Sequence, residues 1–422
     1  MKWSPRFAVA LVLVALASAA FAIVFRGTLN ATVVAVGGVA NIVQAMERAD
    51  WWWRLVLPAV GATAAGLIAL TLRDRSGGNV GEVMDAVATG RAKLSLPSTL
   101  LKSAASWVAI AGGGSLGREG PLIAFGGATG QTAAYWIQLS DAERRVLIAA
   151  GTAAGFTAAY NTPLAAMAFV LEVVTGIVVV ETVVPALISV VISTALTRAI
   201  IGAGPIYGRH EFAITRPGEL AAFAAVGLVA ALVAFGFTRL VMASERAFRR
   251  PWLAPPWRQA LGGLGAGAII CVLPQVAGNG YEPLSVILNS GSTLQIVAFV
   301  LVAKCFATAF SVGSGSPGGV FTPTLLVGGC TGYLVGAGLA ALGFDVIPAG
   351  GYALVGMAAA IAAATHAPLM GAILAFELSG DYELVLPLVL ATAIATALAK
   401  RLRRDSIYTA ELKAREASPA SV

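Results

Sequence analysis

The sequence predicts an all-α, polytopic membrane protein that is built from two related halves. Three observations support this fold class. Of the 422 residues, 58% are apolar and only 12% are charged, against a charged share of about 25% in soluble domains. Apolar runs recur along the whole chain, and blocks of the first half recur in the second. The 48 glycines also suit membrane helices, which pack closely through small residues.

The apolar runs have lengths suited to a hydrocarbon layer of ~30 Å. They comprise residues 7–24, 55–72, 146–159, 164–184, 187–203, 220–241, 260–273, 294–310, 324–342, 352–364 and 384–399. No soluble core accommodates so many apolar segments, so the chain is expected to cross the membrane repeatedly. Some runs are too short to span a bilayer alone, which is typical of broken or partial helices.

The first apolar run permits two interpretations. Lys2 and Arg6 precede it, and the Ala-Ser-Ala sequence at 17–19 resembles a signal-peptidase site. Because every later segment is also apolar, an uncleaved first membrane helix is the favoured interpretation. A cleaved signal peptide is the alternative.

Basic residues gather at three places, and together they predict the orientation of the chain. One group lies before the first apolar run, one in a polar linker and one after the last run. The residues are Lys2, Arg6, Arg246, Arg249, Arg250, Arg258, Lys400, Arg401, Arg403 and Arg404. Because cytoplasmic loops are enriched in Lys and Arg, we expect a multi-pass protein in contact with membrane lipid, with both termini cytoplasmic. The net charge of +7 reflects this topology, and no nucleic-acid partner is expected.

Three blocks of the first half recur in the second half, in the same order and at nearly constant spacing. Residues 151–164 match residues 356–369, and the same alignment places Glu172 on Glu377. The other blocks pair Lys102 with Lys304, Gly117 with Gly319, Pro121 with Pro323, Gly126-Gly127 with Gly328-Gly329, Gly78-Asn79 with Gly278-Asn279, and Glu82 with Glu282. Matches at charged and proline positions indicate a duplication rather than chance similarity between Ala/Gly-rich segments.

The basic linker divides the chain between the two halves. The expected organisation is an N-terminal helix and connection (1–50), a first membrane repeat (51–242), a basic cytoplasmic linker (243–258), a second membrane repeat (259–405) and a C-terminal pore-end segment with a short tail (406–422). Duplicated membrane halves commonly enclose a substrate site near the bilayer midplane.

Two glycine-rich segments in corresponding positions point to that site. They are residues 112–121 (Gly-Gly-Gly-Ser-Leu-Gly-Arg-Glu-Gly-Pro) and 313–323 (Gly-Ser-Gly-Ser-Pro-Gly-Gly-Val-Phe-Thr-Pro). Since proline is at home in the first turn of a helix, each segment is predicted to be unwound backbone that leads into a helix N-terminus. Unpaired N–H groups and the positive end of the helix dipole favour an anion there. The alternative is that these glycines only permit close helix packing.

Charged residues at membrane depth are costly and usually functional, and Arg118 and Glu119 lie inside the first glycine-rich segment. An ionised carboxylate at the helix start has the same charge as the expected ligand. Glu119 would therefore occupy the anion site when ionised and vacate it when protonated, which makes it a candidate gate. An ion pair between Arg118 and Glu119 is the alternative. The repeat counterpart of Glu119 is Phe321.

These segments resemble signature motifs of the CLC family of chloride channels and proton/chloride exchangers. The matching stretches are 117–121 (Gly-Arg-Glu-Gly-Pro), 318–323 (Gly-Gly-Val-Phe-Thr-Pro), 161–165 (Asn-Thr-Pro-Leu-Ala), Glu172 and 406–408 (Ser-Ile-Tyr). The resemblance extends from about residue 55 to 410. It implies an all-helical fold of two inverted-topology repeats with broken and re-entrant helices, and a homodimer with one chloride pore in each subunit.

The resemblance also assigns roles to individual residues. Glu119 matches the external gating glutamate, Tyr408 matches the pore-lining tyrosine, and the backbone N–H groups of Val320 and Phe321 face the anion. The full expected site contains Glu119 as the gate, Gly78, Asn79, Gly120, Val320, Phe321 and Tyr408 as anion-binding residues, and Arg118, Pro121, Gly319 and Pro323 at the pore-lining helix N-termini.

Two positions depart from the family pattern. Gly78 replaces a serine whose hydroxyl helps to coordinate chloride, which leaves the anion preference open. Val173 stands where exchangers typically carry an internal proton-accepting glutamate. The resemblance is therefore strongest to short bacterial voltage-gated chloride channels of the inner membrane, with proton-coupled chloride antiport through the same pore as the alternative. Too few residues follow Tyr408 for a nucleotide-binding regulatory domain.

Other function classes have weaker support. Residues 113–117 match Gly-x-Ser-x-Gly, but the strand-to-helix context that a hydrolase nucleophile needs is not predicted. His210 and His366 are the only histidines, and an enzyme is not expected. A cation-coupled carrier would need buried Asp or Asn ligands, which do not cluster in the sequence. The three cysteines lack metal-ligand spacing, so neither a metal nor a cofactor is expected.

Overall fold

The computed structural model describes residues 3–71, 79–90, 92–176, 180–212, 218–289 and 291–416. Within these ranges the chain is helical and forms no β-strand, which confirms the predicted all-α class. The helices are α1 (Pro5–Gly37), α2 (Ile42–Arg48), α3 (Trp51–Leu70), α4 (Val80–Ala88), α5 (Leu96–Ala111), α6 (Glu119–Trp136), α7 (Asp141–Tyr160), α8 (Pro163–Phe169), η1 (Val170–Val174), α9 (Val180–Ile201), α10 (Glu219–Phe248), α11 (Trp257–Val272), η2 (Pro274–Val276), α12 (Tyr281–Leu288), α13 (Leu294–Gly313), α14 (Phe321–Ala341), α15 (Ala349–Thr365), α16 (Pro368–Ser379), α17 (Val385–Leu402) and α18 (Ile407–Glu416).

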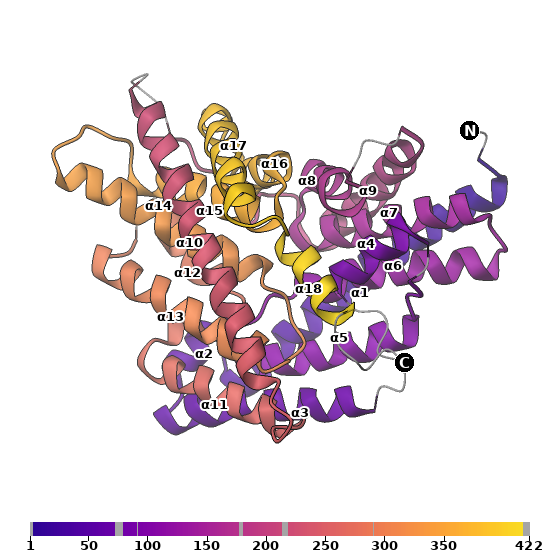
Figure 1. Ribbon diagram of the computed structural model, residues 1–422, viewed down its shortest axis with the longest axis horizontal. Helices are drawn as coiled ribbons and strands as arrows, with labels where there is room; N and C mark the ends of the chain where they lie inside the picture. Colours follow the sequence, from indigo (N-terminus) through magenta and orange to yellow (C-terminus); the bar gives the residue numbers. More distant parts are fainter. Residues whose placement is uncertain are drawn as a thin grey trace.

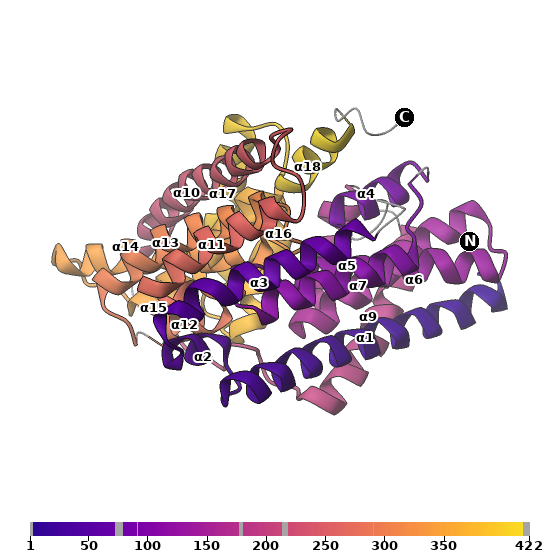
Figure 2. The same cartoon turned by 90° about the horizontal axis from the view of Figure 1, so that it is seen from below.

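The helices are arranged as two halves that meet along the middle of the molecule. In Figures 1 and 2, α4–α9 lie on one side and α12–α17 on the other, while α3 of the first half packs against α11 of the second. Seven helices of the described residues are long and apolar enough to cross a membrane. Shorter apolar helices such as α8 and α16 lie beside them, as expected for broken helices.

The long first helix is an integral part of the membrane domain. α1 packs against α6, α7 and α9, and the small side chains of Ala10, Ala15, Ala19 and Ala22 are fully buried in this contact. If α1 were removed by cleavage, the sides of α6, α7 and α9 that face it would become exposed. This packing supports the interpretation of the first apolar run as a permanent membrane helix.

The ends of α7 and α15 show the internal repeat in the backbone geometry. α7 ends at Asn161 with φ 57° and ψ 35°, and α15 ends at His366 with φ 61° and ψ 30°. Both residues adopt the left-handed conformation that often terminates a helix. The next residues, Thr162 and Ala367, also have nearly equal φ and ψ angles, and a proline then starts the following helix in each half. The predicted repeats are confirmed.

Glycine pairs bring the helices of each repeat into close contact. A Cβ added at Gly126 in α6 would lie 2.0 Å from the carbonyl oxygen of Gly151 in α7. The equivalent crossing in the second repeat joins Gly328 in α14 to Gly356 in α15, where the added Cβ would lie 2.4 Å from a carbonyl oxygen. At these positions glycine permits close helix packing.

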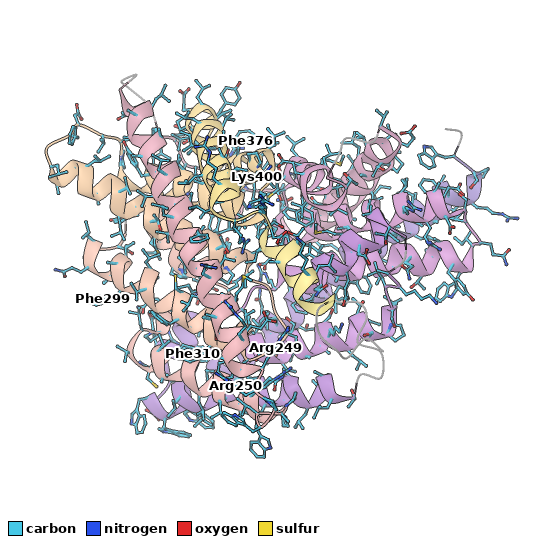
Figure 3. All side chains as sticks on the ribbon, viewed as in Figure 1. Arg249, Arg250, Phe299, Phe310, Phe376 and Lys400 are labelled. Atoms are coloured by element: carbon cyan, nitrogen blue, oxygen red, sulfur yellow. The ribbon has the colours of Figure 1, made fainter. Side chains whose placement is uncertain are left out.

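The polar stretch at 243–258 contains three structural parts. α10 continues to Phe248, residues 249–256 connect, and α11 begins at Trp257. Figure 3 shows Arg249 and Arg250 at the end of α10, and Lys400 near the end of α17. The basic residues of the middle and last groups therefore lie at the ends of long apolar helices.

Candidate anion site

The two glycine-rich segments are joined directly to each other. The N–H of Gly117 donates to the carbonyl of Gly319 at 2.7 Å, and the N–H of Gly319 donates to the carbonyl of Gly117 at 2.8 Å. This reciprocal pair is an isolated antiparallel bridge between equivalent residues of the two repeats. It brings two helix N-termini together at one point between the halves.

Each helix begins two residues after the bridge. α6 begins at Glu119 and α14 at Phe321, so Pro121 and Pro323 both occupy the third helical position. The N–H groups of the first helical turn have no partner within their own helix, and they carry the positive end of the helix dipole. Two such helix starts at one place create a neutral but electropositive site for an anion.

The carboxylate of Glu119 lies at this meeting point. Only 2% of the residue is exposed. One carboxylate oxygen accepts a hydrogen bond from the hydroxyl of Thr322 in α14, whereas the other, Oε2, has no hydrogen-bond partner among the described residues. Among the residues that the structure describes, Glu119 and Arg118 form no ion pair with each other. The gate candidate of one repeat is thus held by a side chain of the other.

The position of the Glu119 carboxylate leaves no room for a side chain at residue 117. A Cβ added at Gly117 would lie 2.2 Å from Glu119 Oε2 and 3.0 Å from the carbonyl oxygen of Gly319. Both distances are shorter than van der Waals contact. Glycine at 117 therefore makes room for the side chain of the next helix start. An added Cβ at Gly120 would have no atom within 4 Å, so the second glycine faces open space.

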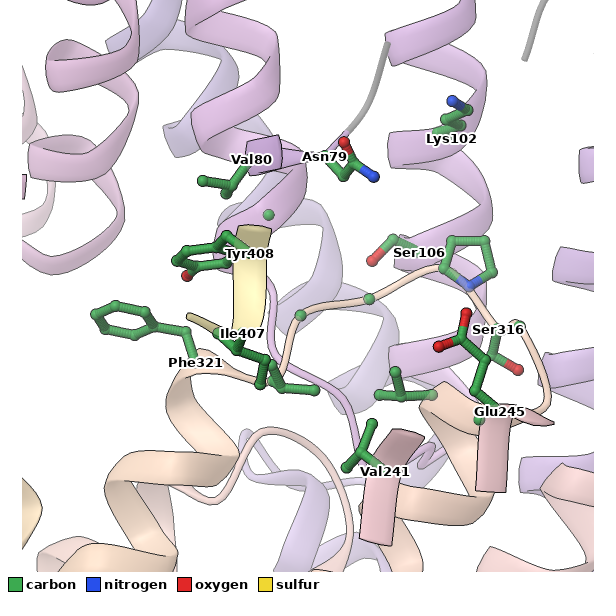
Figure 4. Close-up of a pocket in the computed structure, with 18 of the residues that line it drawn as sticks. Asn79, Val80, Lys102, Ser106, Val241, Glu245, Ser316, Phe321, Ile407 and Tyr408 are labelled. Carbon is green, nitrogen blue, oxygen red and sulfur yellow. The ribbon is translucent and has the colours of Figure 1, made fainter. Parts of the chain in front are cut away.

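A cavity of about 360 Å³ extends from Glu119 along the boundary between the halves. Of the expected site residues, it is lined by Asn79, Glu119, Gly120, Pro121, Gly319, Val320, Phe321 and Tyr408. Figure 4 shows Tyr408 and Phe321 on one side of the cavity, and Ser106, Ser316 and Glu245 on the other. Asn79 caps α4, where its side-chain oxygen accepts from the N–H of Glu82 at 3.0 Å. Gly78 lies outside the described residues.

Aromatic packing fixes the wall that Phe321 gives to the cavity. The ring of Phe321 meets that of Phe156 edge-on at 5.7 Å and lies 5.5 Å from the ring of Tyr160. Tyr408 meets Phe169 edge-on at 6.5 Å. Edge-to-face contacts of this kind stabilise aromatic pairs, so these side chains hold a defined shape around the cavity.

The cavity also contains charges that come from several helices. Lys102 in α5, Arg249 after α10 and Arg258 in α11 line it. Glu245 in α10 forms an ion pair with Arg249. Three cationic side chains and the two carboxylates of Glu119 and Glu245 therefore line the same cavity.

Arg118 and Lys304, the repeat counterpart of Lys102, do not line this cavity. Arg118 lines a separate cavity of about 40 Å³ together with Asn279 and Glu282. Lys304 is fully buried, and its ammonium group donates to the carbonyls of Val276 and Gly278 at 3.1 and 2.8 Å. Pro323 lies in the first turn of α14 but not in the lining of the main cavity.

The Gly-x-Ser-x-Gly stretch has a helical setting. Ser115 lies between α5 and α6 and is fully buried, and its hydroxyl shares a hydrogen bond of 3.0 Å with Thr308. His210 stacks on Phe212, and His366 ends α15. The strand that precedes a nucleophile elbow is not found in the part of the chain that the structure describes.

The chain matches the family of voltage gated chloride channels over residues 60–400. The match includes both repeats, the paired glycine segments and Glu119. The chain belongs to this family. The family is one of transporters and channels, and the resemblance inferred from the sequence motifs is confirmed.

Bacterial relatives that are described as chloride channel proteins support the membership. A protein described as ClcB-like, from Ralstonia nicotianae, is 38% identical over 385 residues, covering 89% of each chain. The voltage-gated ClC-type chloride channel ClcB of Salmonella typhimurium is 34% identical over 374 residues, covering 87% of this chain and 89% of its own. The fold is similar to that of a slow cyanobacterial Cl⁻/H⁺ antiporter, with a TM-score of 0.87 at 24% identity over 99% of this chain and all of the other.

For this chloride channel family member, the motifs identified the helix starts but not the hydroxyl groups next to Glu119. Thr322 lies within the segment 318–323, and Tyr160 within the repeated block 151–164. The available signal for Thr322 was its hydroxyl group next to Phe321, which lines the cavity. Nothing in the spacing indicated that Tyr160 would meet it, because the two residues lie 162 positions apart.

Proposed function

We propose that this chain conducts chloride or a similar small anion across the membrane, through one pore in each subunit, and that protonation of Glu119 opens the pore. The position of the Glu119 carboxylate between the two helix starts carries this proposal. An ionised carboxylate there has the charge of the permeant anion and competes for the same N–H groups. Protonation removes that charge, so the side chain no longer holds the site against chloride.

The proposed site binds the anion through partial charges. Its donors are the backbone N–H groups at Gly120, Val320 and Phe321 and the hydroxyl of Tyr408, with Asn79 at the start of α4. Arg118, Pro121, Gly319 and Pro323 shape the two helix starts, and Gly78 is assigned to the site from the sequence. Binding without a full positive charge in contact is suited to conduction, because a pore must also release its ion.

Two residues favour passive conduction over proton-coupled exchange. They are Val173, at the place where exchangers typically carry an internal proton-accepting glutamate, and its neighbour Glu172. Val173 is apolar and buried, so it offers no group that accepts a proton. The neighbouring Glu172 accepts two backbone hydrogen bonds from α16, from Leu369 at 3.1 Å and Met370 at 2.7 Å. The second candidate is chloride/proton antiport through the same pore, and the antiporter with a similar fold is the observation that favours it.

We place the protein in the bacterial inner membrane as a homodimer, with both termini cytoplasmic. The basic ends of α10 and α17 and the bacterial channel relatives support this orientation and location. Exposed leucines at equivalent repeat positions, Leu164 in α8 and Leu369 in α16, support a symmetric apolar face for pairing. Cysteine crosslinking at these two positions in native membranes is expected to trap the dimer. Crosslinked species of monomer size only would contradict it.

The deciding experiment measures anion flux and internal pH together, using purified protein in liposomes. We expect saturable chloride flux that follows the electrochemical gradient of the anion. An imposed chloride gradient should drive little uphill proton movement. Robust proton pumping against a pH gradient would favour the antiporter and would make Glu172 the relay candidate. Failure to move chloride at all would overturn the proposed function.

A further inference from the structure

Behind the gate carboxylate lies a short chain of buried hydroxyl groups. Thr322 is 2% exposed and Tyr160 is 6% exposed. Their hydroxyl oxygens are 2.9 Å apart, and Thr322 also donates to Glu119. The chain therefore runs from Tyr160 at the end of α7, through Thr322 in the first turn of α14, to Glu119 in the first turn of α6.

The direction of these hydrogen bonds follows from the number of protons. A threonine hydroxyl has one proton to donate, and that proton is directed to the carboxylate. Thr322 must then be the acceptor in its contact with Tyr160, so the phenol donates. Successive hydrogen bonds polarise one another in a low-dielectric interior. The phenol therefore makes Thr322 a stronger donor toward whatever negative group lies in front of it.

The carboxylate covers this donor. Thr322 does not line the cavity, whereas Glu119 does. When Glu119 is protonated and leaves the position between the helix starts, Thr322 loses its acceptor. A buried donor without an acceptor costs free energy comparable to a hydrogen bond. An anion that takes the place of the carboxylate supplies that acceptor.

Tyr160 is well held in place. Its ring lies 5.3 Å from that of Phe156 and 5.5 Å from that of Phe321. Because Phe321 also lines the cavity, the same aromatic group fixes the pore wall and the phenol. The hydroxyl chain is therefore preorganised, whichever negative group it serves.

We propose that Thr322 is a direct ligand of the permeant anion in the open pore and that Tyr160 positions and polarises it. The same hydroxyl then holds the gate carboxylate when the pore is closed. The Thr322 hydroxyl thus donates to the Glu119 carboxylate in the closed pore and to the permeant anion in the open pore. It adds a side-chain donor to the backbone N–H groups of the two helix starts. This inference rests on the proposed function of Glu119 as the gate.

The test separates binding of the anion from holding of the gate by removing the gate. In a Glu119→Ala background, Thr322→Val deletes the hydroxyl with little change of shape, and Thr322→Ser retains it. The readout is the half-saturating chloride concentration for flux into liposomes. We expect Thr322→Val to raise it about ten-fold, as for the loss of one hydrogen bond to a charged group. Thr322→Ser should leave it within about two-fold.

Tyr160→Phe tests the positioning role in the same background. It should raise the half-saturating chloride concentration by a smaller factor, about three-fold, because the donor remains but is no longer polarised. Combined with Thr322→Val it should have no further effect, since its influence passes through the threonine. An independent effect of Tyr160→Phe in the Thr322→Val protein would contradict this.

The outcomes distinguish the inference from the function on which it rests. If Glu119→Ala conducts chloride and Thr322→Val leaves its saturation unchanged, Thr322 only holds the carboxylate, and the inference is overturned. If the unmodified protein shows no saturable chloride flux, both the proposed function and the inference fail. Elution of each variant as a single species in size-exclusion chromatography confirms that the comparison is between folded proteins.

Discussion

Glu172 and Glu377 occupy equivalent positions in the two repeats, and each caps a helix of the other repeat. Glu172 accepts the two N–H groups at the start of α16, and Glu377 accepts those of Leu164 and Ala165 at the start of α8, at 3.0 and 2.8 Å. Carboxylates are favoured at helix N-termini by unpaired N–H groups and by the helix dipole. The two halves are therefore joined by crossed carboxylate caps.

These caps predict a loss of stability on substitution. Glu172→Gln and Glu377→Gln remove the charge and one acceptor oxygen at a helix start. Each should lower the free energy of unfolding by about 1–3 kcal/mol, seen as a lower midpoint of thermal unfolding in detergent. Glu211→Gln, at an exposed glutamate outside the helices, is the control and should leave the midpoint unchanged. Equal midpoints for all three variants would contradict the capping role.

Removal of the gate charge should abolish the dependence of flux on pH. Glu119→Gln mimics the protonated carboxyl group, so we expect a pore that stays open in neutral as well as acid solution. In the unmodified protein, chloride flux should rise as pH falls, because protonation releases the side chain. The measurement is chloride efflux from liposomes over a range of external pH.

The matched control is Glu245→Gln, which changes another carboxylate of the same cavity. It should retain a rise of flux on acidification. A Glu119→Gln protein whose flux stays as pH-dependent as the unmodified one would show that Glu119 is not the gate.

A second route to an open gate is steric. Gly117→Ala places a methyl group where the Glu119 carboxylate lies, so the side chain must leave its position even when it is ionised. We expect raised flux at neutral pH with a weaker pH response. Gly120→Ala adds the same methyl group in open space and should preserve the pH response. Equal pH profiles for the two variants would argue against the observed carboxylate position.

Tyr408 is predicted to contact the anion rather than only to anchor α18. Tyr408→Ala removes both ring and hydroxyl from the cavity wall, and it should raise conductance or weaken chloride binding several-fold while the subunits remain paired. Tyr408→Phe keeps the ring and its contact with Phe169, and so isolates the hydroxyl. Unchanged flux and chloride affinity in a folded Tyr408→Ala protein would favour an anchoring role.

Much of the architecture was predictable because local chemistry decides it. Proline in the first helical turn and glycine before it determine where α6 and α14 begin, so residues 117–121 and 318–323 identified the helix starts. The repeat was predictable because charged and proline positions are paired between the halves. Apolar run lengths anticipated both long and broken helices.

The remaining features depend on contacts between distant segments. The spacing of Glu172 does not reveal that it caps α16, because its partner Leu369 is 197 positions away. Lys102 and Lys304 are equivalent in sequence, yet one lines a cavity and the other donates to buried carbonyls. Their different roles arise from the surrounding helices, which the residue type does not specify.

The bridge between Gly117 and Gly319 also limits when the two helix starts can meet during synthesis. Glu119 and its hydroxyl partner Thr322 are separated by 203 positions, so the ribosome completes the first repeat long before Thr322 exists. Until then the start of α6 lacks the strand-like partner that orients it. The start of α6 can therefore gain its partner only after the segment that leads into α14 has been synthesised.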